Sequence, residues 1–180
     1  DVMAVLVDLA ADVAADEAIV ELGVFEGKTA LYMAWGAQQG HGACLWGVDI
    51  WDLPGGVYGP PFNQPETRER ARRNVEELGF ADQVTLVRGF ALEQAQRWEG
   101  PPIGLLFLDD DHSREAVLAN VEAWTPHLAD GAVLAFDDYD HPDWPGVAEA
   151  VDELVAAGTL EPATIHHNRL AVTRMEQAYG

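Results

Sequence analysis

The chain reads Ile19-Val20-Glu21-Leu22-Gly23-Val24-Phe25-Glu26-Gly27-Lys28-Thr29 at the point that decides its fold. A short apolar run ends there in an acid, and a glycine turn leads into a segment with helical spacing. This pattern predicts a buried strand that feeds a helix through a tight loop, which is where open parallel α/β sheets bind nucleotide-like ligands. Lys28 and Thr29 are expected to begin the helix.

Apolar runs and helical segments alternate along the rest of the chain. The expected strands are 18–22, 44–50, 84–87, 103–108 and 132–136, followed by a hairpin of 159–165 and 170–173. The expected longer helices are 2–15, 28–39, 66–78, 113–128 and 147–157. This alternation predicts an α/β fold whose parallel sheet is covered by helices on both faces. We expect a single domain over residues 1–180.

The composition excludes several classes of function. The net charge is −21, and the few basic residues are mixed with acids, which argues against a nucleic-acid partner. No apolar run has the length of a membrane span and no signal peptide is recognisable, so we expect a cytoplasmic protein without membrane contact. The single cysteine, Cys44, rules out an internal disulfide and is expected to be a buried structural thiol.

One long irregular segment, residues 51–65, interrupts the alternation. It is rich in glycine and proline and carries Trp51, Tyr58 and Phe62. Long loops inside compact domains are often binding loops or lids. Exposed aromatic side chains favour a lid over the ligand site and would suit an aromatic or glycosylated molecule.

Acids stand at, or directly after, the ends of four expected strands. They are Glu21, Asp49, Asp109 and the pair Asp137-Asp138. Ligands of open parallel sheets bind outside these strand ends, so the acids should converge on one cleft. Capping of the next helix explains Asp110 or Asp111, but neither Asp49 nor Asp137-Asp138. Asp49 is placed where a carboxylate can accept hydrogen bonds from ribose hydroxyls.

The side chains of Asp109, Asp137 and Asp138 follow adjacent strands and suggest a metal centre. Close carboxylates repel each other and take up protons unless a cation lies among them. Ligands that are all oxygen suit a hard divalent ion such as Mg²⁺, or Ca²⁺ or Mn²⁺. A solvated acid cluster without a metal is the alternative.

Two common nucleotide-binding motifs do not match the glycine turn. Three residues separate Gly23 from Gly27 where the phosphate loop of ATPases and kinases has four, and Glu21 would repel a triphosphate. The dinucleotide motif is absent because Phe25 stands in place of its second glycine. An NAD-linked Rossmann-type oxidoreductase and a non-catalytic cofactor-binding subunit remain as alternatives.

The pattern Glu-x-Gly-x-x-x-Gly after a strand, with an acid ending the second strand, resembles the class I S-adenosylmethionine-dependent methyltransferases. Residues 107–112 (Phe-Leu-Asp-Asp-Asp-His) and 136–146 (Phe-Asp-Asp-Tyr-Asp-His-Pro-Asp-Trp-Pro-Gly) are similar to the family of macrocin-type sugar O-methyltransferases and, more distantly, to catechol O-methyltransferase. The resemblance covers nearly the whole chain. It implies a three-layer, Rossmann-like, seven-stranded sheet whose last strand is antiparallel.

The resemblance also implies the activity and its partners. A methyl group would move from S-adenosylmethionine to a hydroxyl of a sugar, a glycosylated natural product or a phenol, with Mg²⁺ or another hard divalent cation bound. Related enzymes often associate, so a homo-oligomer is expected.

Site residues carry over from the resemblance position by position. The implied cofactor contacts are Glu21, Gly23, Phe25, Gly27, Thr29, Asp49, Ile50, Trp51, Gly89, Phe90, Ala91 and Asp109. The implied metal ligands are Asp109, Asp137 and Asp138. Asp109 and His112 are the implied catalytic residues, with His112 the leading base because an imidazole titrates near neutral pH. His141 is the rival base, or else shapes the acceptor pocket. Asp110 departs from the family pattern, because related chains have glycine there.

Overall fold

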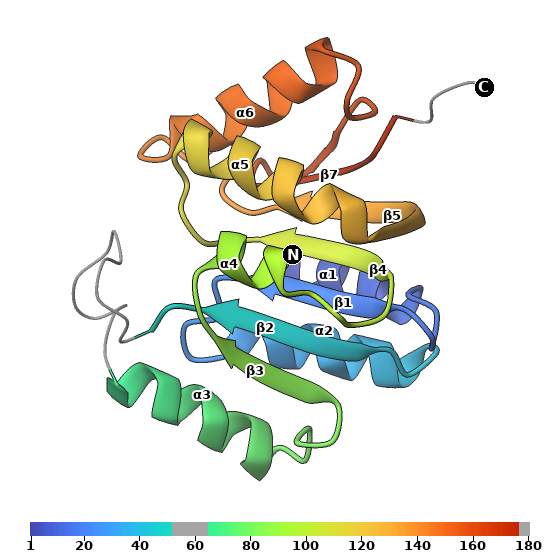
Figure 1. Ribbon diagram of the computed structural model, residues 1–180, viewed down its shortest axis with the longest axis vertical. Coiled ribbons are helices and arrows are strands. Elements are labelled where there is room, and N and C mark those ends of the chain that lie inside the picture. The colour runs from blue at the N-terminus through green and yellow to red at the C-terminus, as the bar shows by residue number, and fades with distance from the viewer. Residues whose placement is uncertain (52–64, 177–180) are drawn as a thin grey trace.

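The computed structural model describes residues 1–51 and 65–176, and its strands form a single mixed sheet (Figure 1). Within this part of the chain the sheet has seven strands in the order β3-β2-β1-β4-β5-β7-β6. Their bounds are Ala18–Leu22 (β1), Cys44–Asp49 (β2), Val84–Arg88 (β3), Ile103–Leu108 (β4), Leu128–Phe136 (β5), Thr164–His166 (β6) and Leu170–Arg174 (β7). Strands β1 to β5 pair in parallel, whereas β7 is antiparallel to β5 and to β6. The expected seven-stranded sheet, with its antiparallel last strand, is confirmed.

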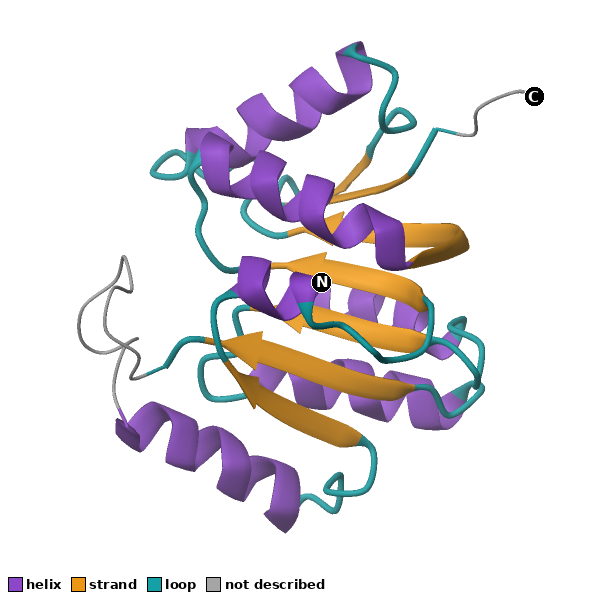
Figure 2. Ribbon diagram, viewed as in Figure 1, coloured by secondary structure: helices purple, strands orange, loops and turns teal. Residues whose placement is uncertain are grey.

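Helices cover both faces of the sheet (Figure 2). Three of them pack on one face, namely α1 (Val2–Ala11), α2 (Lys28–Gln39) and α3 (Pro65–Glu77). Three others pack on the opposite face, namely α4 (Ala91–Gln96), α5 (Arg114–Trp124) and α6 (Pro145–Ala156). A short 3₁₀ turn, Thr125–His127, joins α5 to β5. The two hydrophobic cores share one sheet, which supports our proposal that residues 1–180 are a single domain.

The central strand β1 shows why the opening stretch decides the fold. All five of its residues are buried, and neighbouring side chains point to opposite faces, so that Ile19 joins one core and Val20 the other. A strand buried on both faces must be apolar throughout, as strands of parallel sheets usually are. The exception is Glu21, which is fully buried although it is charged in water.

Several details of the sequence-based prediction are wrong. The helices expected over 2–15 and 113–128 end at Ala11 and Trp124, and the strand expected over 132–136 already begins at Leu128. The first hairpin strand is only β6, because Leu160 makes a single bridge to Met175 and the segment between is irregular. Cys44 is exposed rather than buried, since it lies at the very start of β2, where the strand leaves the core. No helix in the described ranges has the length and hydropathy that crossing a membrane would require.

Candidate active site

The glycine loop between β1 and α2 passes directly over the end of β4. Gly23 has a φ of 85° and Gly27 a φ of 81°, which glycine adopts without strain. A β-carbon added to Gly23 would lie 2.1 Å from the carbonyl oxygen of Asp109. The glycine at this position is therefore required both by backbone conformation and by contact. Helix α2 begins at Lys28, as predicted, and Thr29 lies in its first turn.

Asp49 holds this loop in shape. One of its carboxylate oxygens accepts hydrogen bonds from the backbone N–H groups of Val24 and Phe25, both at 2.8 Å. The other oxygen accepts from the N–H of Trp51 at 2.7 Å. The sequence suggested only a ribose contact for Asp49, and that contact stays a prediction. The bracing of the glycine loop is a role that sequence reasoning missed.

Trp51 is buried, although the prediction placed it among the exposed aromatic residues of a lid. Its indole N–H donates to the carbonyl oxygen of Phe25 at 2.8 Å, and its φ of 41° turns the chain sharply after Ile50. Trp51 thus packs in the core and supports the glycine loop through its hydrogen bond to Phe25. Residues 52–64 of the predicted lid, including Tyr58 and Phe62, lie outside the described residues, and Pro65 begins α3.

Glu21 presents an unpartnered carboxylate beneath the loop. It is 0% exposed, and neither of its side-chain oxygens has a hydrogen-bond partner among the described residues. Burial raises its pKa well above the ordinary value, and the nearby charges of Asp109 and Asp49 raise it further. A buried carboxylate that has no hydrogen-bond donor beside it can bind a ligand that supplies a donor, such as the ammonium group of an amino acid. The residues present therefore fit the methionine end of S-adenosylmethionine.

The segment Gly89-Phe90-Ala91 borders the same loop region from β3. The N–H of Gly89 donates to the carbonyl oxygen of Asp49 at 2.9 Å, and helix α4 begins at Ala91. This brings the three residues to the end of β2, beside Ile50. Their predicted contact with the adenine stays a prediction.

The predicted metal ligands come together, but a cation from the protein already lies between two of them. Asp137 and Asp138 are 4% and 8% exposed, and Asp138 adopts a left-handed φ of 56°. Arg169 donates to both oxygens of Asp137, from Nε at 2.9 Å and from Nη2 at 2.7 Å. Its Nε also lies 3.0 Å from Oδ1 of Asp138. Sequence reasoning missed Arg169.

His112 lies between the carboxylates of Asp109 and Asp138. Its Nε2 is 3.4 Å from Oδ1 of Asp109 and 3.6 Å from Oδ2 of Asp138. Burial lowers the pKa of His112, but the contact with Asp109 and the charges of Asp109, Asp138 and Asp110 outweigh it, so the pKa is raised. Burial also raises the pKa of Asp109, to about 6, against the lowering effect of His112. The structure thus brings together His112, Asp109 and Asp138, as the prediction required.

The rival base His141 stands in the loop after β5. Its Nδ1 accepts a hydrogen bond from the N–H of Asp143 at 3.2 Å. Its ring centre is 6.4 Å from that of Trp144, while the ring of His112 is 5.2 Å from the same tryptophan. His141 thus contacts residues of its own loop, whereas His112 also contacts the carboxylates of Asp109 and Asp138.

Asp110 and Asp111, in the loop between β4 and α5, make their hydrogen bonds to α5 and to the residue before it. The carboxylate of Asp110 accepts two hydrogen bonds from the side-chain amide of Asn120, at 3.1 and 2.9 Å. Asp111 accepts from the N–H of Ser113 at 2.9 Å, directly before α5 begins. Asp110 therefore bonds to α5 through Asn120. The capping role that the sequence suggested for Asp110 or Asp111 falls to Ser113, whose hydroxyl accepts a hydrogen bond from the N–H of Ala116 at 3.3 Å.

The described side chains do not form a metal site. No group of three or more histidine, cysteine, aspartate or glutamate side chains within residues 1–51 and 65–176 is arranged to hold a metal ion. The Mg²⁺ prediction is therefore not supported by the geometry. The physical reason is that Arg169 and His112 already pair with the oxygens that would ligate the ion.

Comparison with known proteins identifies the family. The family described as "Methyltransferase domain" matches residues 20–139, from β1 to the turn after β5. The chain belongs to this methyltransferase family. The matched segment contains the glycine loop, Asp49 and the carboxylates of the site. A search of the curated proteins finds no significant match.

Solved structures confirm the class I methyltransferase fold. Cofactor-bound Rv0187 from MTB is 21% identical over 98% of this chain and 80% of its own, with a TM-score of 0.75. The O-methyltransferase NovP is 18% identical over 97% and 79%, with a TM-score of 0.75. Apo CalS11, described as a TDP-rhamnose 3'-O-methyltransferase of calicheamicin biosynthesis, is 25% identical over 96% and 77%, with a TM-score of 0.68. The chain is an S-adenosylmethionine-dependent methyltransferase.

Proposed function

We propose that this methyltransferase moves a methyl group from S-adenosylmethionine to a hydroxyl group of a small molecule. The observation that carries the proposal is the position of His112, between Asp109 and Asp138, at the strand ends beside the glycine loop. The names of NovP and CalS11, both O-methyltransferases, support transfer to oxygen. A sugar, a glycosylated natural product or a phenol is the acceptor class that the sequence resemblance favours.

The cofactor is proposed to lie along the glycine loop. Glu21 would accept hydrogen bonds from the ammonium group, for which its two unpartnered oxygens are available. Asp49 would hold the loop amides and reach the ribose hydroxyls through its remaining lone pairs. Phe25 is 37% exposed at the turn and would cover one edge of the bound molecule.

The chemistry assigned to the site follows from the reaction. When bound, S-adenosylmethionine supplies a methyl group on a sulfonium, whose sulfur keeps the bonding electron pair as the new oxygen–carbon bond forms. The acceptor hydroxyl must be oriented in line and must lose its proton. His112 would take this proton on one of its two buried ring nitrogens, which have no hydrogen-bond partner among the described residues. Asp109 and Asp138 would stabilise the resulting imidazolium.

The family match sets aside the NAD-linked oxidoreductase, but it leaves the finer expectations open. Dependence on Mg²⁺ was expected from the three carboxylates and is not supported by their arrangement. Cytoplasmic location, a homo-oligomeric state and the absence of nucleic-acid or membrane partners stay predictions from the sequence.

A screen of hydroxylated sugars, glycosides and phenols tests the proposal. Formation of S-adenosylhomocysteine that depends on the acceptor is expected for at least one class. The variant His112→Gln should bind S-adenosylhomocysteine yet turn over poorly. If the folded protein binds the cofactor but methylates only nitrogen or carbon acceptors, the proposal is wrong.

A further inference from the structure

We propose that Arg169 is the resident cation of the carboxylate cluster, formed by Asp109, Asp137 and Asp138, and that it keeps divalent metal ions out. The guanidinium makes two parallel hydrogen bonds to Asp137 and contacts Asp138 as well. Paired bonds of this kind are among the stronger interactions of a protein side chain. The single positive charge offsets part of the repulsion between two carboxylates that are almost completely buried.

The hairpin fixes Arg169 in this position. His167 and Asn168 have φ values of 55° and 54°, and the N–H of Arg169 donates to the carbonyl oxygen of His166 at 3.0 Å. Two central residues with positive φ are typical of the tight turns that join antiparallel strands. The turn is also tied to the site, because the N–H of Tyr139 donates to the carbonyl oxygen of Arg169 at 2.8 Å.

The sheet register carries this turn to the carboxylates. Strand β7 pairs with β5 so that Ala171 lies opposite Phe136, the residue directly before Asp137. Arg169, two residues before Ala171, therefore reaches the end of β5 whenever the sheet is formed. The backbone register of β5 and β7 therefore places Arg169 beside Asp137.

A metal ion at this place would have to displace Arg169. A hard divalent ion needs carboxylate oxygens in its coordination shell. Both oxygens of Asp137 accept hydrogen bonds from the guanidinium, Oδ1 of Asp138 lies 3.0 Å from its Nε, and His112 lies within 3.6 Å of the other oxygen of Asp138. Two positive charges a few ångströms apart, one of them divalent, repel strongly in a partly buried site.

One amino group of Arg169 remains available to bind the molecule that is methylated. Its bonds to the carboxylates use Nε and Nη2, and Nη1 makes no bond with the described residues. Its side chain is 53% exposed, so that this amino group can be approached from outside. Here the inference rests on the proposed function, because Nη1 would donate to the acceptor oxygen as its proton passes to His112. Methyl transfer would then need no divalent metal.

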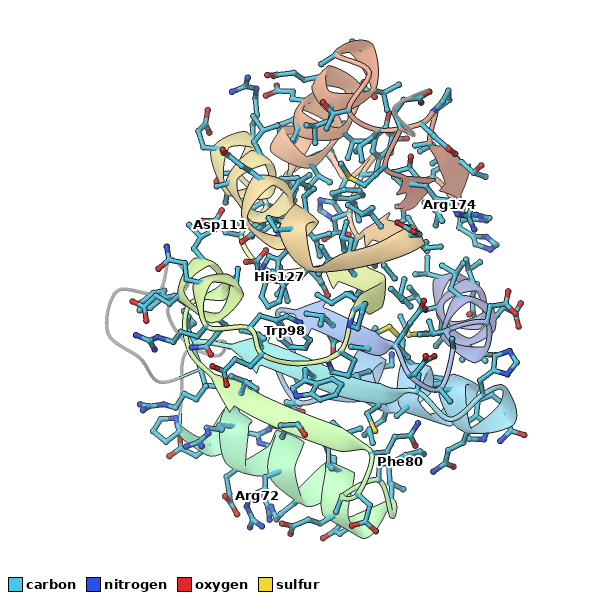
Figure 3. All side chains as sticks on the ribbon, turned by 45° about the vertical axis from the view of Figure 1, so that its right-hand side comes forward. Arg72, Phe80, Trp98, Asp111, His127 and Arg174 are labelled. Atoms are coloured by element: carbon cyan, nitrogen blue, oxygen red, sulfur yellow. The ribbon has the colours of Figure 1, made fainter. Side chains whose placement is uncertain are left out.

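Titration with Mn²⁺, followed by calorimetry and by electron paramagnetic resonance, tests the inference without reference to activity. The native protein should bind Mn²⁺ only weakly. Arg169→Gln removes the positive charge beside the acids. It should bind Mn²⁺ about tenfold or more tightly, because loss of a neighbouring like charge raises the binding constant by about one power of ten or more. Arg174→Gln is the matched control. It also removes one arginine charge, but Arg174 ends β7 and lies far from Asp111 in the loop after β4 (Figure 3). It should bind Mn²⁺ as weakly as the native protein.

A tight Mn²⁺ site in the native protein that is lost in Asp138→Asn would overturn the inference, and this measurement does not depend on whether Arg169→Gln folds. Equal affinities in the native protein and a folded Arg169→Gln would overturn it as well. Once an acceptor is known, turnover should be unchanged in EDTA. If no acceptor is found, the proposed function fails while the Mn²⁺ result still decides the role of Arg169.

Discussion

Gly23 packs backbone to backbone against Asp109, so closely that a β-carbon on the glycine would lie 2.1 Å from the aspartate carbonyl oxygen. This contact joins the loop assigned to the cofactor to the residue assigned to the reaction. Two strands that are neighbours in the sheet, β1 and β4, place these residues side by side. The cofactor loop and the carboxylate cluster are therefore in direct contact through their backbones, and changes at this contact should affect both.

Replacement of Gly23 by alanine should be strongly destabilising. The substitution forces a positive φ on alanine and drives its methyl group into a backbone carbonyl that cannot move aside. We expect the free energy of unfolding to fall by roughly 2–4 kcal/mol, measured by urea denaturation. Gly42→Ala is the matched control, because Gly42 has a φ of 81° but open space around it. It should cost only about 1 kcal/mol. Equal losses would mean that the contact with Asp109 is unimportant.

Replacement of Asp49 by alanine should loosen the glycine loop before any ligand binds. The carboxylate accepts hydrogen bonds from Val24, Phe25 and Trp51, and its loss leaves three amide groups without their partner. Hydrogen exchange of the Val24 and Phe25 amides should become faster in the ligand-free protein, and binding of S-adenosylhomocysteine should weaken. Unchanged exchange together with weaker binding would instead indicate that Asp49 contacts only the ribose.

Glu21 should make the ligand-free protein less stable as the pH rises. Its pKa is higher in the folded state than the ordinary value of 4.5, so folding takes up a proton there. Stability is therefore lost as the pH increases from about 4.5 towards the raised pKa. Glu21→Gln should remove this loss, so that the unfolding free energy of the variant, relative to that of the native protein, increases as the pH rises above about 4.5.

Glu21→Gln should also bind S-adenosylhomocysteine about tenfold more weakly. The variant would bind the ammonium group through a neutral amide instead of a charged carboxylate, which makes a weaker hydrogen bond. Glu122→Gln, at an exposed site on α5, is the control and should change neither property. If the unfolding free energy of Glu21→Gln depends on pH as that of the native protein does, Glu21 is not the cause of the loss of stability at higher pH.

His112 and His141 can be distinguished by a pair of variants. Both rings lie beside Trp144, but only His112 contacts the carboxylates. His112→Gln should lower kcat by about 10²–10⁴-fold, the usual contribution of a general base. His141→Gln should change KM more than kcat if His141 shapes the acceptor pocket. The reverse pattern would assign the base to His141.

The sequence predicts the sheet and the positions of the acids because both depend on local patterns. Buried strands such as β1 need continuous apolar runs, and the acids at strand ends must then meet at one edge of the sheet. What it could not predict is which partners those acids choose. Arg169 is 32 residues from Asp137, and only the antiparallel register of β7 brings them together. Its place in the closing turn was visible in the sequence, but not its side-chain contact.

Residues with two plausible environments were the hardest to predict. An aromatic residue that begins a long loop can face the ligand or the core, and Trp51 is held in the core by its bond to Phe25. Asp49 has the position of a ribose ligand, yet its oxygens bond to the loop amides. In both cases the deciding interaction is with backbone groups, which a sequence pattern does not reveal.

The most direct test of the account is transfer of a labelled methyl group from S-adenosylmethionine to hydroxylated acceptors, with the methylated atom located by mass spectrometry. We expect an O-methyl ether from the native protein in the presence of EDTA. His112→Gln should form it at least about 100-fold more slowly. A folded protein that binds the cofactor but methylates no hydroxyl, or does so only when a divalent metal is added, would contradict the account.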